Sequence, residues 1–434
     1  MNTKVNSPKR KSKKMRIIAS IILTSIAFLL LYFKKINETN KYDLSYSEKI
    51  KNFFSQYQKN MLSISKITNN FYIFLFLIIF IDNYNNIFIS FILIEIFSFG
   101  HYFSAIIKLL FNDKNPFFFK EGYKVHDCGF GWGIPCENII IAIPFFFFLY
   151  DISTLNQRKV ILKIFYILFF VILILFNCLS VIVNETYFLS QVIISILFGL
   201  AIYQILCGLN FKYKDGHTLY IILKHYCIYL LINIFMFVLL VFSYIYSLKV
   251  NKDVKDISCD DGNQKNNDSD KNGNKLINEG SFLSAAIFLG NIFAYFALRC
   301  QYIYSLENNR NYWFQFNFDE LEASESGNTI SLSSIMIMKQ TKWNKTSQIK
   351  SFIRLFLSIF ICLLCFFPYY YIDGNLNFYL IFSVKYLLSF FLFYFVNFFL
   401  FKILFKKLHF INFTLFIQID DKQESLLNNV SNNN

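Results

Sequence analysis

The sequence predicts an all-α protein, namely a polytopic bundle of about ten membrane-spanning helices. Hydrophobic residues make up 55% of the chain and charged residues only 16%, whereas about 25% of the residues in a soluble domain are charged. Apolar runs of about 18 residues or more recur along the chain, and such a run is long enough to cross a bilayer as a helix. The distribution of apolar residues therefore indicates an integral membrane protein.

Ten apolar segments, separated by polar loops, are the predicted spans. They cover residues 17–33, 71–81, 87–110, 139–150, 160–183, 188–207, 219–246, 281–298, 352–371 and 378–404. The first segment is long for a cleaved signal and lacks a small-residue cleavage site, so we expect it to remain as a span or signal anchor. After it, residues 34–70 carry apolar side chains at helical intervals, which predicts an interfacial helix.

Composition divides the chain into five parts. These are a basic tail (1–15), the first span with the interfacial segment (16–70), a membrane core (71–207), further spans around the polar loops 250–279 and 307–348 (208–405), and a polar tail (406–434). The membrane core contains the polar residues from which a functional site can be built.

The formal charge of +14 does not indicate a nucleic-acid partner, because the excess of Lys and Arg lies in the termini and in short loops between spans. Basic residues in such loops mark the cytoplasmic side of a membrane protein. With the N-terminus in the cytoplasm, the basic loops fall inside and the acidic-leaning loop 250–279 falls outside. The same count places residues 108–138 and 184–190 together on the non-cytoplasmic side. We therefore expect residues 1–15 to be a cytoplasmic tail.

Three short polar patches on this non-cytoplasmic side form the candidate site. They are Lys108 with Asn115-Pro116, then Pro135-Cys136-Glu137-Asn138, then the stretch from Ser180 to Gln191. A phosphomonoesterase that works without a metal needs Arg and Lys to hold the phosphate oxygens, a nucleophile such as His, and a second group that protonates the leaving oxygen. Polar groups gathered at helix ends can serve this chemistry at the lipid–water boundary.

The spacing of these patches resembles the type 2 phosphatidic acid phosphatase superfamily, which includes lipid phosphate phosphatases, sphingosine-1-phosphate phosphatases, dolichyl-diphosphatases and glucose-6-phosphatases. The family pattern is K-x6-R-P, then P-S-G-H, then S-R-x5-H-x3-Q, each at the end of a membrane helix. The resemblance covers residues 87–207 and implies a six-helix phosphatase-like core within residues 71–207. The additional spans are more similar to the sphingosine-1-phosphate phosphatase and glucose-6-phosphatase branches.

The departures from the family pattern fall on its catalytic positions. The residues that stand where the family has Arg or His are Asn115, Asn138, Val181 and Tyr187. The resemblance therefore implies a fold that lacks its nucleophile and most of its phosphate-binding charge. The candidates that remain for binding phosphate are Lys108, Cys136, Ser190 and Gln191.

Two histidines are candidates to replace a lost catalytic group. His126 lies in the loop before Pro135, where an exposed His without a role is the more frequent case. His101 lies inside a predicted span, about two helical turns before Lys108 on the same face. An ionisable residue inside a span is a functional candidate, and a buried imidazole bonded to a neighbouring helix is the alternative.

The cysteines do not suggest a metal site. Cys362 and Cys365 lie within an apolar span, where core or lipid-facing roles are more frequent than metal ligation. Cys128 and Cys136 flank the central loop and either pair or stay free, depending on the redox compartment. We therefore expect no metal and no cofactor.

Two classes of function follow from the resemblance. The first is an integral membrane pseudophosphatase without turnover that binds a lipid phosphate or interacts with other membrane components. The alternative is a divergent but active phosphatase that hydrolyses lipid or sugar phosphomonoesters at the luminal face. A transporter or channel is supported by the number of spans alone. We expect membrane lipid as a partner and the endoplasmic reticulum or another endomembrane as the location.

Overall fold

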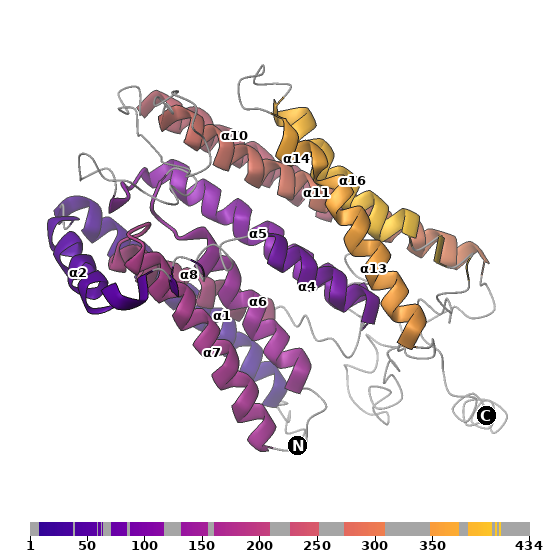
Figure 1. The fold of residues 1–434 in the computed structure, drawn as a ribbon, viewed down its shortest axis with the longest axis horizontal. Coiled ribbons are helices and arrows are strands. Elements are labelled where there is room, and N and C mark those ends of the chain that lie inside the picture. Colours follow the sequence, from indigo (N-terminus) through magenta and orange to yellow (C-terminus); the bar gives the residue numbers. More distant parts are fainter. Residues whose placement is uncertain are drawn as a thin grey trace, which may run out of the picture. The chain divides into compact units, whose positions relative to one another are not determined.

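The structure is a computed structural model of the chain (Figure 1). It describes residues 8–37, 40–58, 60–61, 63, 71–84, 87–116, 132–154, 160–208, 226–250, 273–308, 348–372, 381–401, 404–405 and 408. The regular secondary structure in these ranges is entirely helical, with no strand. This confirms the predicted all-α class for the part of the chain that is described.

The helices overlap the apolar segments, and two further helical elements lie between the first two segments. In the N-terminal half they are α1 (Pro8–Asn37), α2 (Asn40–Phe53), η1 (Ser55–Tyr57), α4 (Phe71–Tyr84), α5 (Ile87–Phe111), α6 (Glu137–Thr154), α7 (Val160–Val183) and α8 (Leu189–Gly208). In the C-terminal half they are α10 (Tyr226–Val250), α11 (Gly273–Asn308), α13 (Gln348–Cys365), α14 (Phe367–Tyr371), η5 (Ile381–Leu388), α16 (Ser389–Phe395) and η6 (Val396–Leu400). The helix within the expected interfacial segment is α2.

Six of the described helices are long and apolar enough to cross a membrane. They are Met15–Lys34, Ile89–Phe111, Val160–Val183, Leu189–Cys207, Tyr226–Lys249 and Ile349–Tyr369. Shorter apolar helices cover Phe71–Asn83, Gly280–Phe296 and Val384–Leu400. These helices support a membrane protein, while the count of ten spans stays a prediction.

Helix α10 exposes a stripe of large apolar side chains at helical spacing. The stripe consists of Leu231, Phe235, Val238, Phe242 and Ile245. A contiguous apolar surface of this kind is unfavourable in water and favourable against lipid tails. The exposed surface of α10 is therefore suited to contact with lipid, as expected of a membrane-spanning helix.

The chain folds into two compact units. The first comprises Met1–Leu75, Leu93–Phe211 and Leu231–Leu289, and the second comprises Phe76–Ile92, Lys212–Leu230 and Gly290–Asn434. The division falls within helices α4, α5, α10 and α11. All three polar patches of the candidate site belong to the first unit.

In the first unit, α1 packs along α8, and α8 also packs against α6. The Ser20 hydroxyl donates a hydrogen bond to the carbonyl oxygen of Ala201 at 3.0 Å. The ring of Phe28 meets that of Phe198 edge-on, with centroids 5.2 Å apart. The N-terminal apolar segment is thus a packed part of this unit.

Two glycines allow α5 and α8 to approach α6 closely. A β-carbon added at Gly100 of α5 would lie 2.7 Å from Cγ1 of Ile141, and one added at Gly199 of α8 would lie 3.0 Å from Cβ of Ile143. Small residues at helix contacts are a common means of close packing in membranes. The close approach places the start of α6 against the end of α5, where the candidate site lies.

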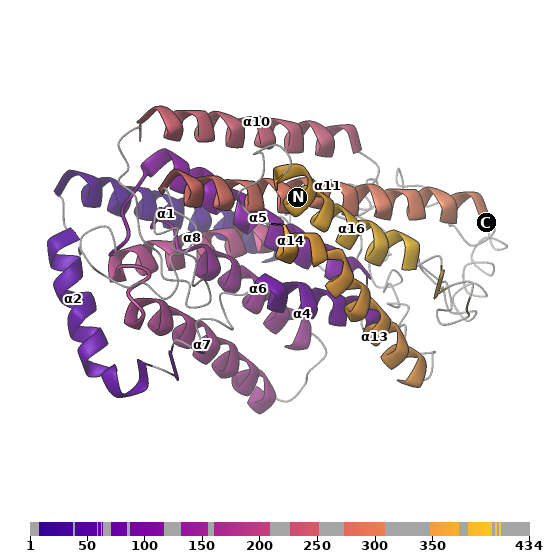
Figure 2. The same ribbon diagram turned by 45° about the horizontal axis from the view of Figure 1, so that its top comes forward.

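Helix α2 lies across the end of the first unit at which α1 ends and α7 leads into α8 (Figure 2). Lys51 of α2 forms an ion pair with the buried Glu185 after α7, with Nζ and Oε2 2.8 Å apart. Glu185 has a φ of 54°, a left-handed conformation that few residues other than Gly and Asn adopt. Ile50 of α2 packs on the apolar cluster beneath. Helix α2 therefore covers the end where the polar patches lie.

In the second unit, a buried arginine joins α13 to the end of α4. Arg354 is 1% exposed, and its Nη2 donates to the carbonyl oxygen of Asn83 and to Ser351 Oγ, each at 2.9 Å. Asn83 Nδ2 in turn donates to Ile79 O at 2.9 Å and to Ser358 Oγ at 3.3 Å. A cation at a helix C-terminus satisfies orphan carbonyl groups and complements the helix dipole.

We expect Arg354→Leu to lower the free energy of unfolding by about 1.5–3 kcal/mol, because a charged hydrogen-bond donor to a buried carbonyl is lost. Thermal unfolding of the purified chain in detergent measures this change. Phe352→Ala is the matched control, because Phe352 lies on the same helix and is 64% exposed. Equal effects of the two substitutions would contradict the assigned role of Arg354.

Candidate functional site

The structure brings residues of the first and third polar patches together around a glycine. The backbone N–H of Gly133 donates to the carbonyl oxygen of Asp113 at 2.8 Å. A β-carbon added at Gly133 would lie only 2.0 Å from Nε2 of Gln191 and 2.3 Å from Oδ1 of Asn115. Only a glycine fits between these two side chains. Gly133, two residues before the second patch, thus lies between Asn115 of the first patch and Gln191 of the third.

Gln191 is fully buried, and its side chain is committed to hydrogen bonds within the chain. Its Nε2 donates to Asp113 Oδ2 at 2.6 Å and to the carbonyl oxygen of Lys114 at 2.9 Å. Its Oε1 accepts from the backbone N–H of Phe188 at 2.8 Å. Both amide hydrogens are therefore used, which fixes the start of α8 on the loop after α5.

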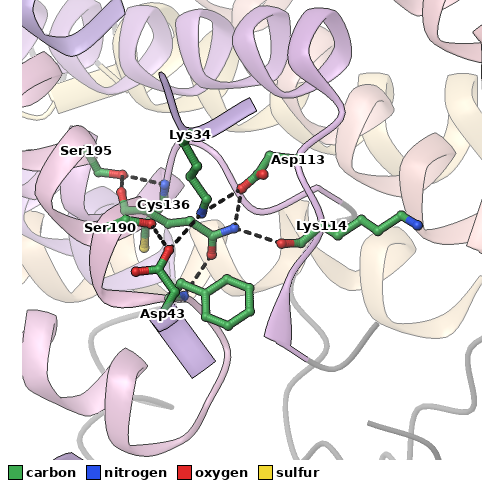
Figure 3. A network of polar contacts seen from close by, with 9 residues as sticks. Lys34, Asp43, Asp113, Lys114, Cys136, Ser190 and Ser195 are labelled. Atoms are coloured by element: carbon green, nitrogen blue, oxygen red, sulfur yellow. Dashed lines mark hydrogen bonds and ion pairs between the residues drawn. The ribbon is translucent and has the colours of Figure 1, made fainter. Parts of the chain in front are cut away.

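Lys34, at the end of α1, is the centre of an ionic network in Figure 3. Its Nζ lies 3.1 Å from Asp113 Oδ2 and 3.5 Å from Asp43 Oδ2, and the lysine is 5% exposed. The Ser190 hydroxyl donates to the same Asp43 oxygen. Ser190, a phosphate-binding candidate, is thus engaged with a carboxylate of α2.

Lys108 is paired with a carboxylate that the sequence analysis did not assign. Its Nζ lies 3.2 Å from Oε2 of Glu137, the first residue of α6. The other oxygen, Oε1, is in contact with Nδ1 of His101. Lys108, His101 and Glu137 are all buried. The chain itself therefore supplies the anion that faces Lys108.

The pairing keeps Glu137 ionised. Burial alone would raise the pKa of its carboxyl group, but the charge of Lys108 and then that of His101 outweigh burial and lower the pKa to about 2. Glu137 precedes the apolar part of α6, so its carboxylate lies where the helix dipole also favours negative charge. Glu137 directly follows Cys136 in the sequence, and an acidic residue in this patch was the signal that could have revealed its pairing with Lys108.

Cys136 contributes its backbone, not its thiol, to the polar contacts. Its N–H donates to Ser195 Oγ at 2.6 Å, and the Ser195 hydroxyl donates to the carbonyl oxygen of Gln191 at 2.6 Å. Burial raises the pKa of the Cys136 thiol to about 12, so the thiol stays neutral. Cys136 is a free cysteine, and Cys128 lies outside the described residues.

Two of the residues that differ from the family pattern described above, Val181 and Tyr187, belong to the apolar core. Val181 and Tyr187 are buried in one cluster with Cys136 and the start of α6. The full set of buried members is Cys136, Ile139, Ile143, Ile174, Cys178, Val181, Ile182, Tyr187 and Val192. Asn138 is half-buried on α6, and His126 lies outside the described residues.

The arrangement favours internal pairing over ligand binding. Lys108 faces Glu137, Gln191 bonds to Asp113, Ser190 bonds to Asp43, and the Cys136 thiol is buried. Within the described ranges, no group of three His, Cys, Asp or Glu side chains is close enough to hold a metal ion. No family model, curated protein or solved structure matches this chain.

We expect Glu137→Ala to lower the free energy of unfolding by about 3–5 kcal/mol, because it leaves Lys108 as a buried charge without its partner. Lys108→Met in the same chain should recover much of this loss. Denaturant or thermal unfolding of the two single variants and the double variant gives the coupling energy. Additive losses would show that the two side chains do not stabilise each other.

Proposed function

We propose that this chain is an integral membrane pseudophosphatase, related to the type 2 phosphatidic acid phosphatases, that acts through binding or interaction and not through turnover. The observation that carries the proposal is the buried Lys108–Glu137 pair with His101 beside it. In a working phosphate site, a lysine at this position would face a phosphate oxygen. Here a carboxylate of the chain lies in that place and neutralises the lysine.

The remaining catalytic requirements also favour this proposal. Transfer of a phosphoryl group needs a nucleophile and fixed positive charges around the phosphate oxygens. Val181 and Tyr187 pack in the apolar cluster, and a phenol with an ordinary pKa of about 10 is a poor phosphoryl acceptor at neutral pH. Asn115 carries no charge, so the cation expected from the family is missing there as well.

The proposed topology has ten spans, a cytoplasmic N-terminus and a six-helix core, and it requires successive spans to alternate in direction. In the first unit, contacts of Lys34 and Gln191 join the end of α1 and the end of α5 to the start of α8. Asp151, near the end of α6, accepts a hydrogen bond from Tyr203, in the last turns of α8, at 2.8 Å. Helices α1 and α5 thus run opposite to α6 and α8, as alternating spans would.

A role in lipid-phosphate binding at Lys108 would require Glu137 to leave the lysine, so we favour an interaction role within the membrane. Membrane lipid is the expected partner, and the endoplasmic reticulum or another endomembrane is the expected location. The polar end with Lys34, Lys108 and Gln191 would face the lumen. An active phosphatase that acts on lipid or sugar phosphates is the alternative that the next experiment separates.

We expect the purified wild-type chain to release no inorganic phosphate from phosphatidate vesicles or from a soluble phosphomonoester. A rebuilt chain would carry Asn115→Arg, Glu137→Gly, Asn138→His, Val181→Arg and Tyr187→His. Its matched control keeps Tyr187 and carries the other four changes. Turnover by the rebuilt chain alone would support both the family relation and the loss of activity. Vanadate-sensitive turnover by the wild type would favour the active alternative.

We expect a protease added to intact vesicles to remove a tag at the N-terminus and to spare a tag within residues 250–279. The reason is the charge distribution, which places the basic tail inside and the acidic-leaning loop outside the cytoplasm. Detergent should make both tags accessible. Cleavage of the tag at 250–279 in intact vesicles would refute the proposed topology.

A further inference from the structure

Helix α2 has one side that faces the rest of the first unit. This inner side carries Asp43, Ser47 and Ile50, which lie within about 60° of arc because successive residues of an α-helix are about 100° apart. Asp43 Oδ2 lies 3.5 Å from Lys34 Nζ. Ser47 is 1% exposed, and Ile50 packs on the apolar cluster described above. These contacts fix how α2 is rotated about its own axis.

The side of α2 opposite the inner side is polar. It carries Ser45, Glu48 and Asn52, which by the same geometry lie about 165° from the inner side. Ser45 and Asn52 are exposed, and Glu48 is half-buried. A polar side that faces away from the packed helices is suited to contact with water.

Between these two sides, α2 exposes a stripe of three aromatic residues and one lysine. The stripe consists of Tyr42, Tyr46, Lys49 and Phe53, and these residues again lie within about 60° of arc. Tyr42 is 74% exposed, Tyr46 57% and Phe53 80%. Lys49 is exposed as well, with its Nζ 5.5 Å from the ring centroid of Tyr46. The aromatic stripe thus forms a third side of α2, about 100° from each of the other two.

The aromatic stripe faces away from the helix ends that α2 covers. Lys51 lies about 170° around the helix from the centre of the stripe. Its Nζ reaches Oε2 of Glu185, in the turn after α7, at 2.8 Å. The turn between α7 and α8 therefore lies on the Lys51 side, and the stripe faces sideways, out of the first unit.

The place of α2 in the first unit puts this stripe at the membrane surface. Helix α2 lies across the end at which α1 ends and α7 leads into α8 (Figure 2), and each of these three helices contains a candidate span. A helix across the ends of spans runs parallel to the membrane surface. Helix α2 begins at Asn40, six residues after the candidate span Met15–Lys34 ends. Six residues reach at most about 20 Å, so α2 stays close to the bilayer.

We propose that the aromatic stripe of α2 is a membrane-contact surface that lies in the phospholipid headgroup layer beside the first unit, with Phe53 as its apolar anchor. Tyrosine and lysine combine an apolar body with a polar tip, and tyrosine is enriched where one end of a side chain is apolar and the other is wet. The partner is thus the lipid surface around the chain. The inference requires that the chain spans a membrane, and it does not depend on the proposed pseudophosphatase function.

Two neighbouring positions on α2 test the contact in lipid nanodiscs. Phe53→Trp puts a tryptophan on the aromatic stripe, and Asn52→Trp, the matched control, puts one on the polar side. Each signal is measured as the difference from the chain without the added tryptophan. We expect phospholipids brominated near the top of the acyl chains to quench Phe53→Trp about threefold more strongly than Asn52→Trp, because an interfacial helix buries its apolar side by about 5–10 Å.

Aqueous iodide should show the reverse order, with stronger quenching of Asn52→Trp. Equal quenching of the two variants by the brominated lipids would overturn the proposal. Protection of Phe53→Trp from both quenchers would also overturn it, since a second copy of the chain or another protein would then cover the stripe.

The effect of the stripe on α2 has a separate readout. Tyr42→Ser, Tyr46→Ser and Phe53→Ser in one chain should speed amide hydrogen exchange of α2 in nanodiscs about tenfold, because aromatic surface removed from water stabilises the position of the helix. The ion pairs of the inner side remain in this variant, so the first unit should stay folded. Ser45→Ala with Asn52→Ala is the matched control and should leave the exchange unchanged. Equal exchange rates in the two variants would refute the anchoring role of the stripe.

Discussion

The candidate site depends on the polar contacts that the buried carboxylate of Glu137 makes with α5. Two side chains of α5, Lys108 and His101, converge on this carboxylate, and all three residues are buried. A buried ion is tolerated only when a partner compensates for its lost hydration. By placing the partner at the first residue of α6, the chain ties the start of α6 to α5. The Cys136–Ser195 hydrogen bond then extends the link to α8.

At the same end of the first unit, two further lysines are paired with carboxylates of the chain. Lys34 is shared by Asp43 and Asp113, and Lys51 of α2 pairs with Glu185. The partners come from α1, α2, the loop after α5 and the turn after α7. Opposite charges of one chain therefore hold together the ends of helices whose apolar faces alone would allow them to slide or rotate.

Hydropathy was sufficient to locate the helices, because apolar runs of this length have few alternatives to a helix. Motif spacing also predicted that Lys108, Asn115 and Gln191 lie at the same end of the helical bundle. It did not reveal that Glu137 would satisfy Lys108, since that pairing depends on the close approach of α5 and α6 at Gly100. The hydrogen bond of Arg354 could not be predicted from the sequence either, because its acceptor, the carbonyl oxygen of Asn83, is 271 residues away.

The packing of α1 against α8 has a consequence for biosynthesis. Ser20 and its acceptor at Ala201 are separated by 181 residues, and Asp43 and Ser190 by 147. At a synthesis rate of about 5–20 residues per second, the first helix waits on the order of ten to forty seconds before its partner emerges from the ribosome. Asp113, the second carboxylate partner of Lys34, is synthesised about midway through that interval. The N-terminal segment is therefore complete well before the helix against which it packs.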